Sequence, residues 1–221
     1  MTKNGSQSDS IERFGNFQKR YYLPARPYGF ALFRLYFRLK AVGVEHLPDS
    51  GPGILVPNHS SFLDPPLLSA VVPRVVYYLM LANHFYHSRW NWLFSRLPCI
   101  PLKRGSVANT DAMKVCLQVL EHGQFLCMFP EGGIARRHKA GGARHGATLL
   151  AIRSGAPIIP IGIQGADRAL TLGQRFPRPK PITIRFGAPM QVPEIDTRDK
   201  EALQAITEQI MNRVQSLQTG A

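Results

Sequence analysis

The sequence predicts an α/β fold: a mixed central sheet flanked by helices and preceded by an N-terminal amphipathic helical segment. Two observations support this fold class. Short apolar runs bounded by Gly or Pro alternate along the chain with segments of helical periodicity. The predicted strands are rich in β-branched and aromatic residues, whereas the last predicted helix has apolar residues on one side only. The length of 221 residues suits one domain with a sizeable core.

The elements follow from these patterns in chain order. Strands are predicted at 53–56, 75–80, 99–102, 125–129, 158–163 and 182–186. Pro160 lies inside the fifth of them, which favours an edge strand or a bulge because proline has no N–H to donate. Helices are predicted at 29–40, 67–72, 84–97, 111–122, 146–154 and 200–217, with Gly123 and Gly155 ending two of them. Loops are expected at 132–145 and 164–181.

Composition limits the partners. Lys and Arg number 27 against 14 Asp and Glu, a net charge of +13, which favours an anionic partner: membrane lipid, nucleic acid or a phosphorylated substrate. A solvated basic surface is the alternative. The three cysteines show no CxxC spacing and suit buried thiols in a reducing compartment. The first ten residues have no apolar core of a secretory signal, and no stretch of about 18 uncharged apolar residues predicts a spanning helix.

The N-terminal part divides into two segments before the domain expected at 43–221. Residues 1–20 are predicted to be a mobile polar tail, and residues 21–42 an amphipathic helical segment in which aromatic side chains alternate with basic ones. Arg34 and Arg38 are expected on one face of its helix. Such a helix suits a phospholipid membrane surface, which predicts peripheral or monotopic association at the cytoplasmic face. Packing of its aromatic residues into the core is the alternative, and no nucleic-acid motif is recognised, so no nucleic acid is expected.

One turn carries the main candidate residues. Asn58, His59 and Asp64 lie between the strand 53–56 and a helix that starts at Asp64-Pro65-Pro66. His59 is then just outside the helix and Asp64 at its beginning, so the carboxylate could orient the imidazole as a general base. Asp64 could instead serve only as a helix N-cap, and His59 as an ordinary polar turn residue.

Three further blocks strengthen the catalytic interpretation. Asn58-His59-Ser60-Ser61-Phe62-Leu63-Asp64 resembles the NHx4D motif of the glycerolipid acyltransferases, the 1-acylglycerol-3-phosphate acyltransferase family, and Phe129-Pro130-Glu131-Gly132 resembles their FPEG motif. The run 100–105 resembles the intervening arginine motif, and the run 156–163 the fourth, proline-containing block. Four blocks in the family's order form a specific signal over residues 40 to 190.

The resemblance implies an O-acyltransferase of phospholipid biosynthesis or remodelling. It implies that His59, oriented by Asp64, is the general base and that an acyl group moves from acyl-CoA or acyl carrier protein to the hydroxyl of lysophosphatidic acid or a related lysophospholipid. It further implies that Arg104 and the Glu131-Gly132 turn bind the acceptor. The acceptor-binding residues are expected to be Asn58, Lys103, Arg104, Glu131, Gly132, Gly133, Arg136 and Arg137. No bound cofactor is expected.

The pattern departs from the family at one point. Ile134 stands where the family often has an arginine after FPEG, and Arg136 or Arg137 could substitute. A different lipid alcohol or amine is therefore an alternative acceptor. Three different mechanisms or functions also fit the residues: Ser60 or Ser61 acting as nucleophile, a hydrolase that activates water, and a catalytically inert protein that binds membranes or nucleic acid. His84 and His87 have a spacing that could share a metal, but no third ligand is apparent and no metal is predicted.

Overall fold

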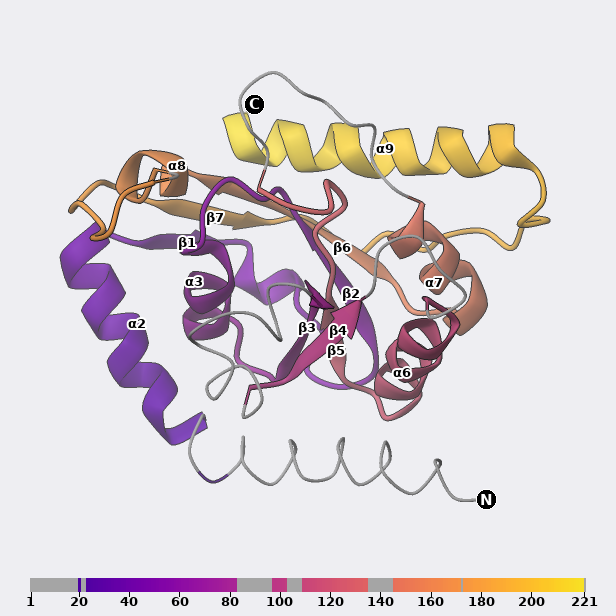
Figure 1. Cartoon of the computed structure of the whole chain (residues 1–221), viewed down its shortest axis with the longest axis horizontal. Helices are drawn as coiled ribbons and strands as arrows, with labels where there is room; N and C mark the ends of the chain where they lie inside the picture. Colours follow the sequence, from indigo (N-terminus) through magenta and orange to yellow (C-terminus); the bar gives the residue numbers. More distant parts are fainter. Residues whose placement is uncertain are drawn as a thin grey trace.

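A single mixed sheet organises the chain. The computed structural model describes residues 20, 23–82, 97–102, 109–134, 145–171 and 173–220. Within these residues the sheet has seven strands in the order β1-β7-β6-β2-β5-β3-β4 (Figure 1). Every neighbouring pair is parallel except β6 and β7, which are antiparallel. The strands are β1 (Lys40–Val42), β2 (Gly53–Pro57), β3 (Val76–Leu81), β4 (Cys99–Leu102), β5 (Phe125–Cys127), β6 (Ile158–Gln164) and β7 (Thr183–Phe186).

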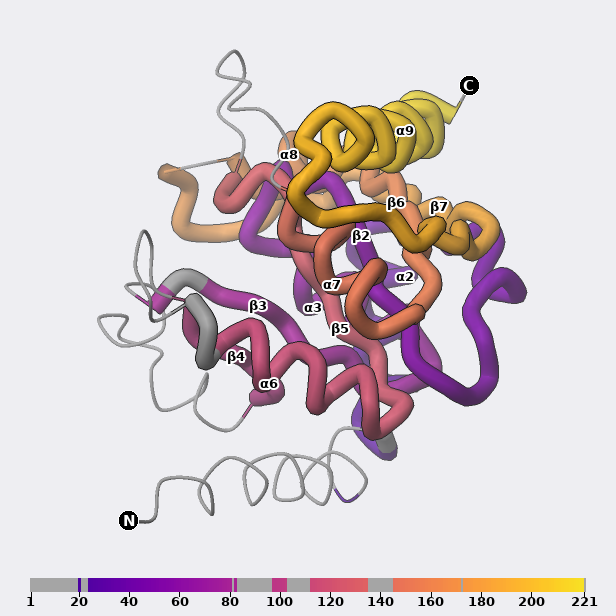
Figure 2. Tube along the Cα trace, turned by 90° about the vertical axis from the view of Figure 1, so that its right-hand side faces the viewer, coloured from indigo at the N-terminus to yellow at the C-terminus, as the bar shows by residue number. Residues whose placement is uncertain are grey.

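Helices cover both faces of this sheet. Alternate residues of the central strand β2 point to opposite faces, so Leu55 packs with α2 and α3 whereas Ile54 and Val56 pack with α6, α7 and α9. Figures 1 and 2 show α9 running along the sheet at the top of the molecule. The helices are α2 (Leu23–Phe37), α3 (Asp64–Val71), α6 (Asn109–Glu121), α7 (Gly146–Ser154), α8 (Ala166–Ala169) and α9 (Lys200–Thr219), with a 3₁₀ turn η2 at Val44–His46. The predicted α/β class with a mixed, helix-flanked sheet is confirmed.

The N-terminal helix differs from its prediction. It was expected at 29–40, but α2 ends at Phe37, and Arg38 takes a left-handed conformation with φ 49°. Arg34 and Arg38 therefore do not share a helical face, because the chain turns between them and continues as β1. Phe37 and Leu39 are buried on either side of this turn. The strand β1, which no local pattern in the sequence predicts, lies inside the segment 21–42 and is part of the sheet.

Two helix ends agree with the prediction in detail. Gly155 ends α7 in a left-handed conformation with φ 66°, and its N–H donates to the carbonyl of Ala151. Gly123 follows α6 with φ 68°, and its N–H donates to the carbonyl of Leu120. Glycine reaches these angles without steric cost, so it stops each helix where the next strand must begin. The helix predicted at 84–97 lies largely outside the described residues.

Of the two alternatives predicted for Pro160, the edge strand is wrong, and a bulge is present opposite the proline. β6 lies between β2 and β7, and Pro160 pairs with Val56 in the parallel register. Its carbonyl accepts from the N–H of Gly187, beyond the end of β7. Pairing is irregular here: from the bridge Ile158↔Met190 to the pair Ile161↔Phe186, β6 advances three residues and its partner segment four. A bulge on the partner segment therefore lies opposite the proline, whose missing N–H is not needed there.

One glycine sets how closely the last helix approaches the sheet. A Cβ atom on Gly162 of β6 would lie 2.3 Å from the backbone nitrogen of Gln218 in α9. No side chain fits between two backbones at that separation. The C-terminal end of α9 therefore rests directly on the centre of the sheet.

Candidate active site

The candidate site lies where β2 and β5 end. These strands are parallel neighbours, so their carboxyl ends lie at the same edge of the sheet. The turn after β2 and the turn after β5 consequently meet. The ring of His59 stacks on the ring of Phe129 with centroids 4.0 Å apart, and the backbone N–H of His59 donates to Glu131 Oε2 at 3.4 Å. Ligands of α/β sheets commonly bind at this edge.

His59 and Asp64 form the central pair. His59 Nδ1 lies 2.9 Å from Asp64 Oδ2, with the Asp64 side chain fully buried and the His59 side chain 14% exposed. The carboxylate accepts, so in the neutral ring Nδ1 carries the proton and Nε2 has the free lone pair. Among the described residues Nε2 makes no hydrogen bond. The ring is thus held by one nitrogen and presents the other as a base.

Asp64 acts on the turn before it, not on the helix after it. Its Oδ2 also accepts from the backbone N–H groups of Ser60, at 2.8 Å, and Ser61, at 2.9 Å. α3 begins at Asp64, and its N-cap position is occupied by Leu63 without a side-chain bond. Pro65 and Pro66 follow and have no N–H groups that a capping carboxylate could bind. The alternative that Asp64 serves as the helix N-cap is therefore wrong, and its carboxylate instead holds the turn of residues 58–61.

Asn58 braces the same turn against β6. Its Nδ2 donates to the carbonyl of Ile163 at 2.9 Å, and its Oδ1 accepts from the N–H of Ile163 at 2.6 Å. The side chain is buried, so the structure gives Asn58 a bracing role, and its contact with substrate stays a prediction. This role depends on which strand lies beside β2, and no local pattern in the sequence specifies that neighbour.

The two serines of the turn have different surroundings. Ser61 Oγ donates to the carbonyl of Leu170 at 3.0 Å and is buried, which ties the turn to the segment after α8. Ser60 Oγ is buried without a hydrogen-bond partner among the residues that the structure describes. Neither hydroxyl bonds to the imidazole of His59 in this part of the chain. A nucleophilic serine needs such a base within hydrogen-bond reach, so this arrangement does not favour one.

Glu131 is the third titratable group of the site. Burial raises the pKa of its carboxyl from 4.5 to about 6; the backbone N–H and the charge of His59 oppose this rise, and the charge of Asp64 adds to it. Gly132 follows with φ 68°, a conformation that favours glycine, and its N–H donates to the carbonyl of Phe129. Glu131, Gly132 and Gly133 therefore lie beside His59, as parts of one tight turn.

A buried thiol lies at the end of β5, next to the pair. Cys127 is fully buried, and burial raises the pKa of its thiol well above the ordinary value, with the charge of Asp64 acting in the same direction. A thiol in such surroundings stays protonated and unreactive. All three cysteines are free and buried, as the composition predicted.

Several predicted site residues lie outside the described part of the chain. They are Lys103, Arg104, Arg136 and Arg137, together with His84 and His87. Across the described ranges, no group of three His, Cys, Asp or Glu side chains is arranged to hold a metal ion. The absence of a metal stays a prediction.

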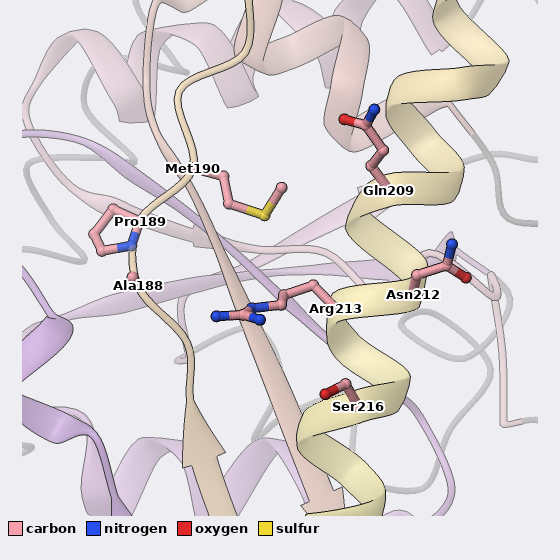
Figure 3. A pocket seen from close by; sticks show the side chains of 7 residues that line it. All are labelled: Ala188, Pro189, Met190, Gln209, Asn212, Arg213 and Ser216. Atoms are coloured by element: carbon pink, nitrogen blue, oxygen red, sulfur yellow. The ribbon is translucent and has the colours of Figure 1, made fainter. Parts of the chain in front are cut away.

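A pocket elsewhere on the molecule contains none of these residues. It lies between the segment 188–190 and α9 (Figure 3). Gln209, Asn212, Arg213 and Ser216 of α9 line it, and no acid–base pair is among them. The candidate site is therefore defined by the convergence of the two turns rather than by this pocket.

Known proteins resemble this chain in sequence over the region that contains the site. Residues 38–164, more than half of the chain, match the family described as "Acyltransferase". The chain is 28% identical over 140 residues to a chloroplastic 1-acyl-sn-glycerol-3-phosphate acyltransferase of Arabidopsis thaliana, a match that covers 62% of this chain and 39% of the relative. It is 30% identical over 144 residues to a protein named Taffazin of Dictyostelium discoideum, covering 58% and 50%. The chain thus matches well under half the length of the chloroplastic relatives.

The fold also resembles a solved structure. The crystal structure of the 1-acyl-sn-glycerophosphate (LPA) acyltransferase PlsC from Thermotoga maritima superimposes with a TM-score of 0.70. The superposition covers 90% of this chain and 80% of that one, at 21% sequence identity. The arrangement of strands and helices is therefore shared along almost the whole chain.

Proposed function

This chain belongs to the acyltransferase family, and from that premise we propose that it transfers a fatty acyl group to a lysophospholipid. The donor is the thioester of acyl-CoA or acyl carrier protein. The acceptor is the free hydroxyl of lysophosphatidic acid or a related lysophospholipid, in phospholipid biosynthesis or remodelling. The names of the relatives support this acceptor class. The observation that carries the proposal is the 2.9 Å contact between His59 Nδ1 and Asp64 Oδ2.

His59 is the proposed acid–base residue. Its Nε2 takes the proton of the acceptor hydroxyl as that oxygen attacks the thioester carbonyl carbon. The tetrahedral intermediate then collapses, the C–S bond breaks, and Nε2 returns the proton to the departing thiolate. One ester forms, one thiol leaves, and the imidazole is restored. Asp64 keeps the proton on Nδ1 in the resting state and stabilises the imidazolium formed during the reaction.

Direct transfer without an acyl-enzyme is favoured by the surroundings of the possible nucleophiles. Ser61 Oγ is bonded to the carbonyl of Leu170, and Cys127 is buried with a raised pKa. Neither group is activated by His59. The acceptor hydroxyl is therefore the nucleophile that the base serves.

The acceptor phosphate requires cationic groups near this turn. β4 ends at Leu102, and because β3, β4, β5 and β2 are parallel, the chain leaves β4 at the edge that holds His59. Lys103 and Arg104 follow directly in the sequence. Arg136 and Arg137 follow the Glu131 turn in the same way. A guanidinium can grip phosphate through two parallel hydrogen bonds, so these four residues are the proposed phosphate ligands, with Glu131 bonding a glycerol hydroxyl or an arginine.

We also propose that α2 lies on a phospholipid surface. Its inner side packs through Phe30, Phe33 and Phe37 against the core, whereas Tyr28, Leu32 and Leu35 point outward and are each more than half exposed. A helix that is apolar on both sides needs a second apolar environment. Among the described helices, none combines the length and apolarity that crossing a bilayer requires.

Thiol release from the donor tests the function. Wild type, His59→Ala and the matched control His122→Ala, an exposed histidine at the end of α6, are each given acyl-CoA or acyl carrier protein thioester. Release that requires lysophosphatidic acid, persists in His122→Ala and disappears in His59→Ala supports acyl transfer. Release without acceptor would identify a thioesterase, and silence with every lysolipid would overturn the proposal.

A further inference from the structure

The segment between α8 and β7 carries an isolated aromatic side chain in a cationic setting. Phe176 is 81% exposed. Arg175, Arg178 and Lys180 surround it in sequence and are exposed as well. The sequence contains no acidic residue between Asp167 and Glu194, so this segment has no negative charge to balance them. Single exposed hydrophobic residues are common, but an exposed aromatic in a segment with three cations and no acidic residue points to a surface that is both apolar and anionic.

Hydrogen bonds hold this loop, residues 173–181, in a fixed shape. The N–H of Arg178 donates to the carbonyl of Ala169 at 2.7 Å, and the N–H of Lys180 to that of Arg178 at 2.8 Å. Pro177, Pro179 and Pro181 further restrict its backbone. Phe176 is therefore displayed by an ordered loop, and less conformational entropy is lost when it binds.

The loop is bonded to α2, and the residues just before it are bonded to the turn of residues 58–61, which holds His59. Tyr36 of α2 donates its hydroxyl to the carbonyl of Pro177 at 2.9 Å, and Figure 1 shows the loop beside the C-terminal end of α2. Three residues before the loop begins, the carbonyl of Leu170 accepts from Ser61 Oγ of that turn. The turn has its own outward apolar side chain, Phe62, which is 59% exposed. Exposed apolar groups thus occur on three connected elements.

We infer that the 173–181 loop is a second membrane contact, which inserts Phe176 into an anionic phospholipid surface while its cations bind lipid phosphates. Together with Leu32 and Leu35 of α2, it places the turn that holds His59 at the lipid surface. The inference rests on the proposed function in one respect: a lipid acceptor gives the contact its purpose. An acidic protein such as acyl carrier protein would match the cations, but the outward apolar residues of α2 and Phe62 favour lipid.

Vesicle binding by the full chain tests this contact. Wild type, Phe176→Ser and the combined Arg175→Gln/Arg178→Gln/Lys180→Gln variant are sedimented with phosphatidylcholine vesicles, with and without phosphatidylglycerol. Phe176→Ser should weaken binding to anionic vesicles on the order of tenfold, the effect of withdrawing part of a phenylalanine from an apolar phase. The charge variant should lose the preference for phosphatidylglycerol. Val42→Ser, an exposed apolar residue of β1, and Arg153→Gln, an exposed cation of α7, are the matched controls and should bind like wild type.

A second readout guards against misfolding and separates the two proposals. Wild type contains Trp90 and Trp92, and Phe176→Trp adds a third tryptophan. Bromine-labelled acyl chains should quench a larger fraction of the tryptophan fluorescence in Phe176→Trp than in wild type. Unchanged vesicle binding by Phe176→Ser with no added quenching would overturn the inference. The inference would also be overturned if the variants bound vesicles like wild type and lost only thiol release from the acyl carrier protein thioester. Wild-type thiol release with lysolipid acceptors is measured separately, and silence with every one of them would refute the proposed function while leaving the binding result intact.

Discussion

The side-chain amide of Asn58 and the backbone of Ile163 hydrogen-bond to each other in both directions. The contact continues the pairing of β2 with β6 for one residue beyond the end of β2. Asn58 thereby fixes the point at which the chain leaves the sheet, one residue before His59. The orientation of the imidazole consequently depends on β6 as well as on Asp64.

Replacing Asn58 should therefore affect both stability and catalysis. Asn58→Ala leaves the N–H and carbonyl of Ile163 buried and unpaired, which should lower the free energy of unfolding by about 1–3 kcal/mol. It should also lower kcat, because the turn loses its brace. Urea unfolding and thiol release measure the two effects, with Asn212→Ala on the exposed side of α9 as control. A variant with wild-type kcat would show that the bond serves folding alone.

Asp64→Asn should reduce kcat by about 10²- to 10⁴-fold, the range of a general acid–base contribution. An amide oxygen can still accept from Ser60 and Ser61, so the turn should keep its shape. It cannot stabilise the imidazolium as a carboxylate does. Steady-state kinetics should show KM changing much less than kcat, and Asp49→Asn, an exposed aspartate, should behave like wild type. A rise in KM as large as the fall in kcat would argue that Asp64 binds substrate.

The raised pKa of Glu131 predicts a specific dependence of protein stability on pH. Burial raises the pKa of its carboxyl from 4.5 to about 6, so the folded protein binds the proton more tightly than the unfolded chain. The ionised carboxylate destabilises the fold at pH 7, and this penalty disappears as the pH falls through 6 to below 4.5. Glu131→Gln should accordingly be more stable than wild type at pH 7, on the order of 1 kcal/mol after solvent screening.

Unfolding curves for wild type and Glu131→Gln across pH 4 to 8 measure this difference. Glutamine keeps a side-chain oxygen that can accept from the N–H of His59. Glu121→Gln, at the exposed end of α6, is the control and should show no such trend. A stability difference that grows on acidification would have the wrong sign for a raised pKa.

Two separate glycine-to-alanine substitutions test the close approach of α9 to β6. Gly162→Ala places its Cβ 2.3 Å from the backbone nitrogen of Gln218, so α9 must shift, and stability should fall by several kcal/mol. In Gly29→Ala nothing lies within 4 Å of the new atom, and α2 should gain about 0.5–1 kcal/mol. Thermal unfolding compares the two variants. Similar changes in Tm for the two variants would show that α9 can shift away from β6 without a loss of stability.

Local signals in the sequence located most of the core elements. The glycines at 123 and 155 end α6 and α7 as predicted, because helix termination depends on the local φ angle. β2 was found from an apolar run whose residues are all buried. The proximity of His59 to Asp64 also followed from neighbouring residues in one turn, together with the family motif.

The remaining features depend on residues distant in the sequence. β1 has three residues and is a strand because β7 lies beside it, so its own pattern gave no signal. The pattern around Pro160 predicted an edge strand or a bulge without deciding between them, because the bulge that accommodates the proline lies on the partner segment. Likewise, the stacking of Phe129 on His59 requires that β5 lie next to β2, which no local pattern specifies.

The pairing of β1 with β7 has a practical consequence for handling this protein. The chain passes from α2 directly into the outermost strand, with Phe37 and Leu39 buried at the junction. Trimming the N-terminal 42 residues to improve solubility would leave β7 as a bare sheet edge beside an emptied apolar socket. Such an edge recruits other chains, so truncation should promote aggregation. The intact polypeptide is therefore the better starting point for a soluble preparation.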